Sequence, residues 1–248
     1  MSIRIGTAGW SIPTASAASF PGEGFHLERY SRVLPCAEIN SSFHRPHAPA
    51  VYARWASLTP RGFRFSVKLP RAITHDGELR RARAPLDAFV DQIAALRSRL
   101  GPLLVQLPPS LGFDARVART FFGLLRARHE GAVVCEPRHP TWFESRAIAA
   151  LVEHRIGLVA TDPSRIGEAT RPGAWMGARG DGAGATVYYR LHGSPRKYWS
   201  RYPPERIAEW SRQLRALPPS ADAWCIFDNT ASGAAIENAL ELQRMLSI

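Results

Sequence analysis

Cysteine is scarce in this sequence. Its 248 residues include only three, Cys36, Cys135 and Cys225. An odd number of cysteines, with no CxxC pair and no Cys/His ligand spacing, excludes a disulfide-stabilised scaffold and a zinc module. All three lie within or beside predicted strands, where a free thiol behaves as a small apolar side chain. We therefore expect buried thiols and a cytoplasmic protein, because the cytoplasm keeps cysteines reduced.

Long hydrophobic runs are also absent. No apolar stretch approaches the roughly 18 to 20 residues that a membrane-spanning helix needs, although 45% of the residues are hydrophobic. The first residues, Met1 to Gly6, read as a strand, without the basic segment and apolar core of an export signal. The sequence therefore predicts neither a membrane span nor export.

Lysine is nearly missing. Only Lys68 and Lys197 are present beside thirty arginines, and the net charge is +11. Such a charge attracts anionic partners, including phosphorylated metabolites and nucleic acid. Many of the arginines, however, fall on predicted outer helices, where solvated positive faces are common. We therefore favour a small anionic substrate over nucleic acid as the partner.

Short apolar runs recur along the chain, and most end on a polar residue before a Gly/Pro loop. The predicted strands are Ile3–Gly6, Ala37–Asn40, Arg64–Lys68, Leu103–Gln106, Val133–Glu136, Gly157–Thr161, Thr186–Leu191 and Trp224–Phe227. Helical patterns lie between most of these runs. They cover Leu27–Val33, Pro49–Leu58, Leu86–Leu100, Ala115–Ala127, Pro140–His154, Pro204–Leu217 and Gly233–Met245.

This alternation predicts an α/β fold of the TIM-barrel type, a (β/α)₈ barrel of parallel strands inside a ring of helices. The length agrees, because one such barrel takes about 250 residues. We find no internal repeat or low-complexity linker and expect a single domain over residues 1–248. Two stretches depart from the alternation: a long loop, Pro70–Pro85, and an irregular segment after the sixth strand, Pro163–Gly184. The second is expected to be an active-site flap or an insertion that covers an edge.

Such barrels carry their chemistry at the carboxyl ends of the strands, where the polar residues of this chain gather. Glu38, Glu136, Asp162 and Asp228 lie at or beside four of these ends. Carboxylates held close together in a partly dry rim do not all ionise easily, so one of them is expected to serve as a general acid/base. The alternative is that each pairs with an arginine in a structural ion network.

Lys68, His139 and His192 are the other candidate catalytic residues. Lys68 ends a predicted strand in a chain that otherwise uses arginine, and an amine can lose its proton when desolvated, unlike a guanidinium. The alternative for Lys68 is an ammonium paired with Glu38 or Glu136. His139 and His192 follow strand ends, and histidine ordinarily titrates near neutrality.

Histidine and carboxylate side chains at a barrel rim are also typical ligands of a catalytic divalent metal. The candidate ligands are His192, Glu136 and Asp162, but the chain has no HxH, HExxH or other tight ligand spacing. A metal-dependent hydrolase or nuclease is therefore an alternative, and no cofactor is predicted.

The loops after the seventh and eighth strands are where these barrels commonly bind phosphate on backbone N–H groups. Gly193 and the run Asn229–Gly233 occupy these loops, although Thr230 or Ser232 could simply cap the last helix. Residues near the strand ends complete the predicted substrate-binding set. It consists of Trp10, Asn40, Gln106, Arg138, Arg190, Gly193, Asp228, Asn229 and Thr230.

The run Arg196–Tyr202 interleaves cations with aromatic side chains. This pattern can stack a base or sugar while neutralising phosphate, as in proteins that bind single strands. The aromatic residues could equally pack on the barrel rim. A non-catalytic nucleic-acid-binding protein is therefore a further alternative.

Several longer motifs follow one another over nearly the whole chain. They are Ile5–Trp10, Ala37–Phe43, Phe63–Lys68, Pro70–His75, Leu100–Pro109, Glu136–Phe143, Tyr189–Gly193 and Phe227–Thr230. With these motifs the sequence resembles the YecE-like family catalogued as domain of unknown function 72. The resemblance implies a TIM-barrel-like fold with the polar motifs at one mouth, and it implies no particular reaction. Similar sequences usually have Ser or Cys at Ala8, often Tyr at His44 and commonly Asn at Asp228.

Taken together, the sequence predicts an enzyme that acts by general acid/base chemistry on a polar anionic substrate, such as a phosphorylated or nucleotide-like molecule. Glu136 is expected to lead, with Lys68 and His192 assisting. Arg138 and Arg190 are expected to bind negative charge, and the amides of Asn40, Gln106 and Asn229 to orient the ligand.

Overall fold

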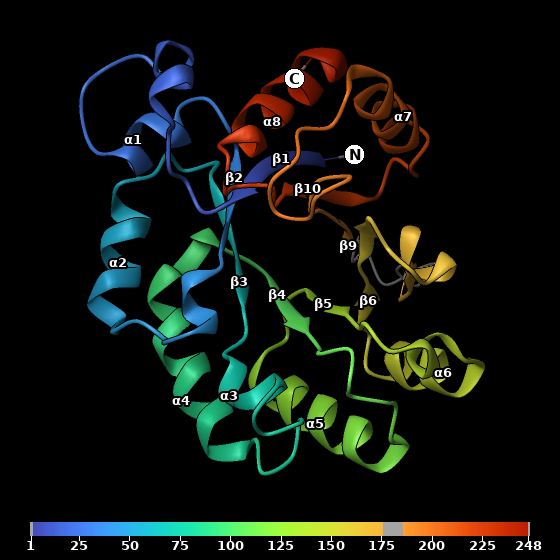
Figure 1. Ribbon diagram of the computed structural model, residues 1–248. Coiled ribbons are helices and arrows are strands. Elements are labelled where there is room, and N and C mark those ends of the chain that lie inside the picture. The colour runs from blue at the N-terminus through green and yellow to red at the C-terminus, as the bar shows by residue number, and fades with distance from the viewer. Residues whose placement is uncertain (1, 176–185, 248) are drawn as a thin grey trace.

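The computed structural model describes residues 2–175 and 186–247, and its strands form a barrel surrounded by helices (Figure 1). The strands are β1 (Ser2–Ala8), β2 (Cys36–Ile39), β3 (Arg64–Lys68), β4 (Leu100–Gln106), β5 (Val133–Glu136), β6 (Gly157–Leu158), β7 (Ala160–Asp162), β8 (Gly173–Ala174), β9 (Thr186–Leu191) and β10 (Asp222–Phe227). Their order in the sheet is β7-β9-β10-β1-β2-β3-β4-β5-β6-β8. All neighbouring pairs are parallel except the short β6–β8 pair.

The two ends of this sheet meet because β6 and β7 are successive parts of one extended segment. Gly157 and Leu158 pair with β5, whereas Ala160 to Asp162 pair with β9. Between them, the backbone N–H of Val159 still donates to the carbonyl of Cys135, at 2.9 Å. The segment formed by β6 and β7 therefore bonds first to β5 and then to β9, and the sheet nearly closes into a barrel. The predicted TIM-barrel-like α/β fold is confirmed.

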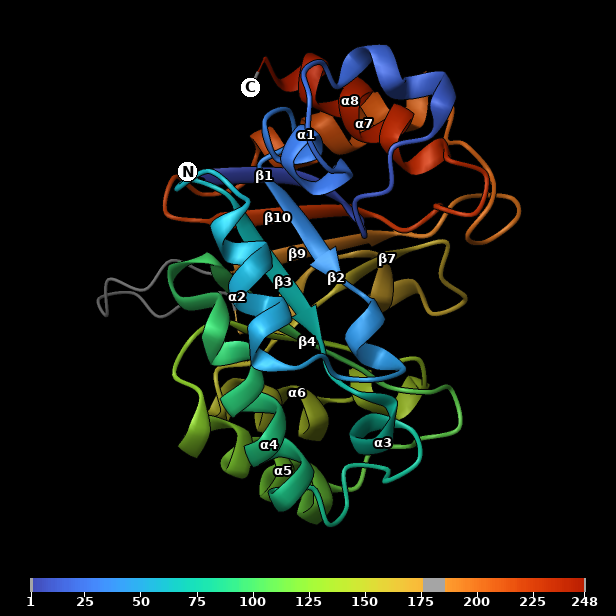
Figure 2. The ribbon, with the colours of Figure 1, turned by 90° about the vertical axis from the view of Figure 1, so that its left-hand side faces the viewer.

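Helices cover the outside of the barrel (Figures 1 and 2). In the described ranges, the α-helices are α1 (His26–Ser31), α2 (Pro49–Ser57), α3 (Arg71–Thr74), α4 (Arg83–Ile93), α5 (Ala115–Arg128), α6 (Ser145–Glu153), α7 (Pro204–Arg215) and α8 (Ala234–Leu246). Short 3₁₀ helices occupy Thr14–Ser19, Ser41–Phe43, Ala94–Arg99, Pro140–Phe143 and Gly167–Thr170. None of the helices described combines the length and the apolar character that crossing a lipid bilayer requires.

Helix α5 shows how local sequence sets these elements. The Asp114 side chain caps its first turn by accepting from the backbone N–H groups of Arg116 and Val117, at 3.0 and 3.1 Å. Its buried face repeats at helical spacing through Ala118, Phe121, Phe122 and Leu125. The apolar stripe therefore packs against the barrel, while Arg116, Arg119 and Arg128 of the helix are exposed.

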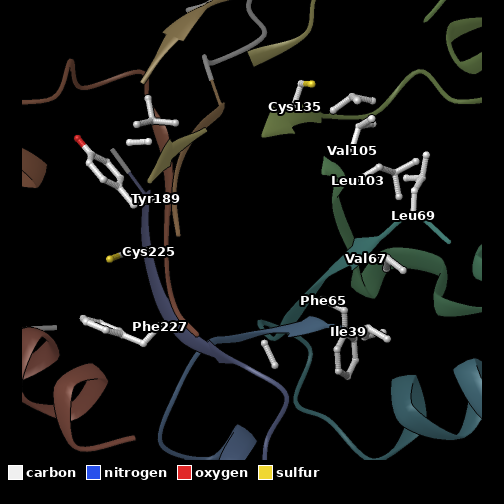
Figure 3. Packing of buried hydrophobic residues seen from close by; sticks show 14 of the residues in the cluster. Ile39, Phe65, Val67, Leu69, Leu103, Val105, Cys135, Tyr189, Cys225 and Phe227 are labelled. Atoms are coloured by element: carbon white, nitrogen blue, oxygen red, sulfur yellow. The ribbon is translucent and has the colours of Figure 1, made fainter. Parts of the chain in front are cut away.

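Alternation along the strands separates two apolar cores. In β10, Ala223, Cys225 and Phe227 belong to the large core between strands and helices, and Figure 3 shows such side chains pointing away from the centre of the strand ring. The residues between them, Trp224 and Ile226, join a smaller cluster with Cys36, Leu104, Val134, Val159 and Tyr188. Because successive side chains of a strand face opposite sides, this smaller cluster lies inside the barrel. The next inward positions, toward the carboxyl ends, are polar.

Several predicted boundaries are wrong. The helix expected over Leu86–Leu100 is replaced by α4, the 3₁₀ helix Ala94–Arg99 and the start of β4. The chain turns at Arg97, where φ is +50°, because Leu100 pairs with Phe65 of β3. Gly101 and Pro102 lie in β4, at an irregularity in its register, and do not terminate a helix. A hypothetical Cβ on Gly101 would lie 2.6 Å from the Trp224 ring, which explains why glycine occupies that position.

Other segments also differ from expectation. The helix predicted from Pro140 is a 3₁₀ turn followed by α6, and the predicted loop Pro70–Pro85 contains α3 and the start of α4. In the irregular segment after the sixth strand, the structure has the 3₁₀ helix Gly167–Thr170 and β8. Residues 176–185 of that segment lie outside the described part of the chain.

Candidate active site

The Arg190 guanidinium lies among three carboxylates that come from different strands. Its Nε and Nη2 donate to the two oxygens of Glu38 at 2.9 and 2.8 Å. Nη1 donates to Glu136 at 2.6 Å, and Nη2 also donates to Asp228 at 2.9 Å. Glu38 and Glu136 lie in β2 and β5, Arg190 lies in β9, and Asp228 follows β10. The closed barrel thus brings together residues that are far apart in the sequence.

The charged groups of this cluster are buried, so their pKa values depend on how the charges are paired. The side chains of Arg190, Glu38 and Glu136 are each no more than 1% exposed. Burial alone would raise the pKa of Glu136, but Arg190 and Arg138 outweigh it and hold that pKa well below its usual value. The same arrangement holds the pKa of Asp228 down against its own burial, chiefly through Arg190 and a hydrogen bond with His192. Both carboxylates are therefore ionised at neutral pH.

His192 lies at the carboxyl end of β9, beside this cluster. Its Nδ1 is 3.0 Å from Oδ2 of Asp228, and its Nε2 is 3.5 Å from Oε1 of Glu136. The second distance is too long for a strong hydrogen bond, and Nε2 is buried without a hydrogen-bond partner among the described residues. The Tyr198 ring packs edge-on against the imidazole, with ring centres 5.4 Å apart.

Lys68, the last residue of β3, completes the charged group. Its side chain is almost fully buried, and Nζ lies 3.9 Å from the centre of the Phe43 ring. No side chain in the described residues forms a hydrogen bond or ion pair with Nζ. Burial, together with the charge of Arg190, lowers the pKa of Lys68 to about 8, although Glu38 and Glu136 act in the opposite direction.

A cavity of about 200 Å³ opens beside Glu136 and His192. Three cationic side chains line it: Arg138 after β5, Arg165 after β7, and Lys197 in the loop after β9. Arg138 also donates through Nε and Nη2 to Glu136, at 3.0 and 2.9 Å, and reaches the Tyr198 hydroxyl at 3.3 Å. The cavity therefore combines a positively charged rim with an imidazole and a carboxylate in its wall.

Ser66 and Tyr188 support the cluster from the interior of the barrel. The Tyr188 hydroxyl donates to Glu38 at 3.0 Å and lies 2.6 Å from Oγ of Ser66. The sequence interpretation missed both residues, although each lies two positions before a candidate, Lys68 or Arg190, and so shares its face of the strand. It also missed Arg165 and gave Lys197 no individual role, because irregular loops carry no periodic signal.

Among the predicted site residues that lie away from the cluster are Asp162, His139 and Trp10. The Asp162 side chain accepts from Arg206 of α7 at 2.6 Å, on the outer side of the barrel. His139 caps the 3₁₀ turn Pro140–Phe143, its Nδ1 accepting from the backbone N–H of Thr141. Trp10 packs edge-on against Trp55 and Phe65 in the outer core.

The predicted ligand-orienting residues have varied surroundings. Nε2 of Gln106 donates to the carbonyl of Leu107 at 3.1 Å, while Oδ1 of Asn40 is buried without a partner in the described residues. Nδ2 of Asn229 donates to Ser200 and to Asn238 of α8, tying the last strand to the last helix. Thr230 is exposed, and the N-cap of α8 is Gly233, with no side-chain cap.

The loop after β9 is partly buried and partly exposed. The N–H of Gly193 donates to the hydroxyl of Tyr202, which is buried and in turn donates to the carbonyl of Asp162. Trp199 is 46% exposed, and Arg196 lies 4.6 Å from its ring centre. The loop therefore packs through Tyr202 and exposes Trp199.

The proposed metal ligands His192, Glu136 and Asp162 do not converge, because Asp162 faces α7. No group of three or more His, Cys, Asp or Glu side chains suited to holding a metal ion occurs in the described parts of the chain. At the centre of the carboxylates lies Arg190, so a guanidinium supplies the positive charge that a bound cation would otherwise provide.

These features define a TIM-barrel-like protein with a buried arginine–carboxylate cluster and a cationic cavity at the carboxyl ends of its strands, the end that the β2 and β3 arrowheads mark in Figure 2. The family model described as protein of unknown function DUF72 matches residues 4–248. The chain therefore belongs to the DUF72 family.

Relatives and solved structures agree with this assignment. The chain is 24% identical to the UPF0759 protein YunF of Bacillus subtilis, over 99% of this chain and 95% of that protein. It is 32% identical to the UPF0759 protein YecE of Escherichia coli, over 57% of this chain and half of that protein. A DUF72 family structure from Thermotoga maritima superposes with a TM-score of 0.79 over the whole of both chains, at 22% identity. One from Enterococcus faecalis has a TM-score of 0.74 and 23% identity, and covers 100% of this chain and 98% of that one.

Proposed function

We propose that this protein is a cytoplasmic enzyme that uses His192 as a general acid/base on a small anionic substrate held at the carboxyl mouth of the barrel. The observation that carries the proposal is the cavity beside His192, which is lined by Arg138, Arg165 and Lys197. The three free, buried cysteines fit a reducing compartment.

The hydrogen bond between His192 and Asp228 supports the role of the imidazole. Asp228 is ionised and can only accept, so Nδ1 of His192 carries the proton of that bond. Neutral His192 then has an unprotonated, buried Nε2 without a hydrogen-bond partner in the described residues, on a side chain that lines the cavity. A histidine oriented by a carboxylate in this way can take a proton from a substrate and return it at neutral pH.

The cationic rim supports an anionic substrate. Arginine binds phosphate and carboxylate groups through two parallel hydrogen bonds, whereas lysine contributes a point charge. Arg138 is anchored by Glu136, while no ion pair engages Arg165 or Lys197 in the described residues. A cavity of about 200 Å³ is smaller than most small-molecule sites, so it suits a compact phosphorylated or carboxylated molecule and not a nucleic-acid duplex.

Glu136 takes a different role in this proposal from the leading one that the sequence predicts. Two arginines hold it ionised, and a carboxylate with so low a pKa is a weak base at neutral pH. Glu136 instead orients Arg138 and stabilises positive charge that develops on His192. Lys68, whose pKa is about 8, remains a second proton carrier near Arg190.

The test begins with a screen of small phosphorylated and carboxylated metabolites for thermal stabilisation of the wild-type protein. For any metabolite that binds, Arg165→Gln and Lys197→Gln are expected to weaken binding by about tenfold or more, since each removes a charge-assisted contact. Arg116→Gln removes the same charge from the exposed side of α5 and is expected to leave binding unchanged. His192→Gln should retain binding and lose turnover. Undiminished turnover in His192→Gln, or undiminished binding in both rim variants, would refute the proposal.

A further inference from the structure

The amino ends of the strands, opposite the mouth that carries His192, enclose a second charged cavity. It measures about 370 Å³ and lies where β1, β3, β4 and β10 begin. Arg4, Arg64 and Arg97 line it together with a single acid, Asp222, and the Trp224 ring borders it from inside the barrel. We propose that this cavity is a second anion-binding site, which takes the phosphate group of a small phosphorylated molecule.

The single carboxylate does not neutralise these arginines. Oδ1 of Asp222 accepts from Arg4 at 2.8 Å, and Oδ2 accepts from the indole N–H of Trp224 at 3.0 Å. Both of its oxygens are therefore engaged away from Arg64 and Arg97. The three arginines and one aspartate leave this cavity with a net charge of about +2, since arginine stays protonated throughout the ordinary pH range.

The neighbouring contacts of the arginines leave donors free. Nη1 of Arg64 donates to the carbonyls of Arg61 and Phe63, at 2.8 and 2.9 Å. Its Nε and Nη2, and every side-chain nitrogen of Arg97, have no hydrogen bond or ion pair with the described residues. Arg99 is held in the same way, by the carbonyls of Arg61 and Thr59. Backbone carbonyls thus position the guanidinium groups without cancelling their charge.

Like charges that crowd around a hollow repel one another unless an anion enters it. Partial burial, with the adjacent charges of Arg4 and Arg99, lowers the pKa of Arg64 although Asp222 acts in the opposite direction, and this shift reflects the same crowding. An oxyanion between Arg64 and Arg97 would accept two or more charge-assisted hydrogen bonds and relieve this repulsion. Phosphate matches the planar fork of a guanidinium and carries more charge than a carboxylate.

The size of the cavity sets the class of ligand. Small-molecule sites usually enclose about 300 to 1,000 Å³, so this cavity exceeds what a lone phosphate ion fills and suits a phosphorylated metabolite. The site is separate from the mouth, and none of its lining residues takes part in the chemistry proposed for His192. Each of the two proposals can therefore fail without the other.

The experiment measures pyrophosphate binding by isothermal titration calorimetry at low salt, in a protein that carries Arg165→Gln and Lys197→Gln to remove the mouth site. Arg97→Gln and Arg64→Gln, each added to that background, are expected to weaken binding by at least about tenfold. Arg97 is exposed and its side chain pairs with none of the described residues, so its replacement should not disturb folding. Arg116→Gln, added to the same background, is the control with equal charge and is expected to have no such effect.

Further titrations distinguish the sources of the phosphate group. Inorganic phosphate should bind more weakly than pyrophosphate or a nucleoside diphosphate, and a single-stranded oligonucleotide should not compete for the site. The proposal is overturned if pyrophosphate does not bind in the background protein, or if Arg97→Gln and Arg64→Gln both leave its affinity unchanged. An equal loss in Arg116→Gln would also overturn it, by showing attraction to the overall charge only.

Discussion

The imidazole of His192 is bonded through Nδ1 to the one oxygen of Asp228 that Arg190 also engages. Oδ2 of Asp228 lies 3.0 Å from Nδ1 of His192 and 2.9 Å from Nη2 of Arg190. Because that oxygen can only accept, the position of the ring proton is set by the same carboxylate that neutralises the buried guanidinium. The charge of the cluster and the tautomer of His192 are therefore linked through a single atom.

This linkage predicts the response of the tautomer to substitution at Asp228. In Asp228→Asn, the amide oxygen can replace Oδ2, so neutral His192 should keep its proton on Nδ1. In Asp228→Leu no acceptor remains there, and the proton should move to Nε2, which faces Glu136 at 3.5 Å. Nitrogen-15 NMR of labelled histidine rings distinguishes the two tautomers, with His192→Gln to assign the signal. Finding the Nδ1-protonated form in both variants would contradict the proposed control by Asp228.

Arg190→Met is expected to be among the most destabilising substitutions of the chain. It leaves Glu38, Glu136 and Asp228 without their shared cation, and removing one partner from a buried ion pair costs about 3–5 kcal/mol. Arg206→Met is the matched control, because its pairs with Asp162 and Glu209 are partly exposed and should contribute only about 1 kcal/mol or less. Urea unfolding at pH 7 measures both free energies.

The acid dependence of stability in the wild-type protein and in Arg190→Met tests the same role of Arg190. Arg190 depresses the folded-state pKa values of Glu136 and Asp228, so their contribution is present above the ordinary carboxyl pKa of about 4 and is lost as pH falls through the lower folded values. The wild-type protein should lose stability over that interval, and Arg190→Met should lose much less. Equal losses in the two proteins, or equal destabilisation by Arg190→Met and Arg206→Met at pH 7, would contradict a central role for Arg190.

The alternation of apolar and polar residues was sufficient to predict most strands of the fold. β3, β5 and β9 have the bounds that the sequence predicts, since their outward residues form a clear apolar series. The prediction of one helix over Leu86–Leu100 was wrong. Its apolar spacing continues through Leu96 and Leu100, but the pairing of Leu100 with Phe65 requires the chain to turn at Arg97. A long-range pairing of this kind leaves no trace in local periodicity.

The candidate site, like the fold, was predictable where its residues lie on strands and not where they lie in irregular loops. Glu38, Glu136, Arg190 and His192 meet because inward positions near the ends of parallel strands converge in any closed barrel. Asp162 lies outside because it shares its face with Leu158 and Ala160, which belong to the outer core. The alternation of side chains along the strand already predicts this outward position from the sequence. The cavity could not be predicted, because Arg165 and Lys197 come from irregular loops.

Lys68 is expected to titrate near pH 8, far below an ordinary lysine. Since the chain has only two lysines, isotope labelling of lysine gives two side-chain signals, and Lys197→Gln assigns them. Between pH 8 and about 10.4, the ordinary lysine pKa, the unfolded chain binds more protons than the folded one, so burial of Lys68 becomes less unfavourable as pH rises. The wild-type protein should gain up to about 3 kcal/mol relative to Lys68→Met over this interval. A Lys68 signal that titrates above pH 10 would refute its desolvation.

Alanine substitutions at Gly193 and Gly9 form a matched pair that tests how closely the loop after β9 packs at the mouth of the barrel. Both have positive φ angles, +89° and +85°, so alanine at either position carries a backbone cost of about 1–2 kcal/mol. A Cβ on Gly9 would meet nothing within 4 Å, whereas one on Gly193 would lie 2.6 Å from the carbonyl oxygen of Ser200 and 2.9 Å from Cβ of Asn229. Gly193→Ala should therefore cost about 1–3 kcal/mol more than Gly9→Ala in urea unfolding, because backbone has to move. It should also weaken anion binding, since the displaced loop carries Lys197, and equal effects of the two substitutions would show that this loop adapts freely.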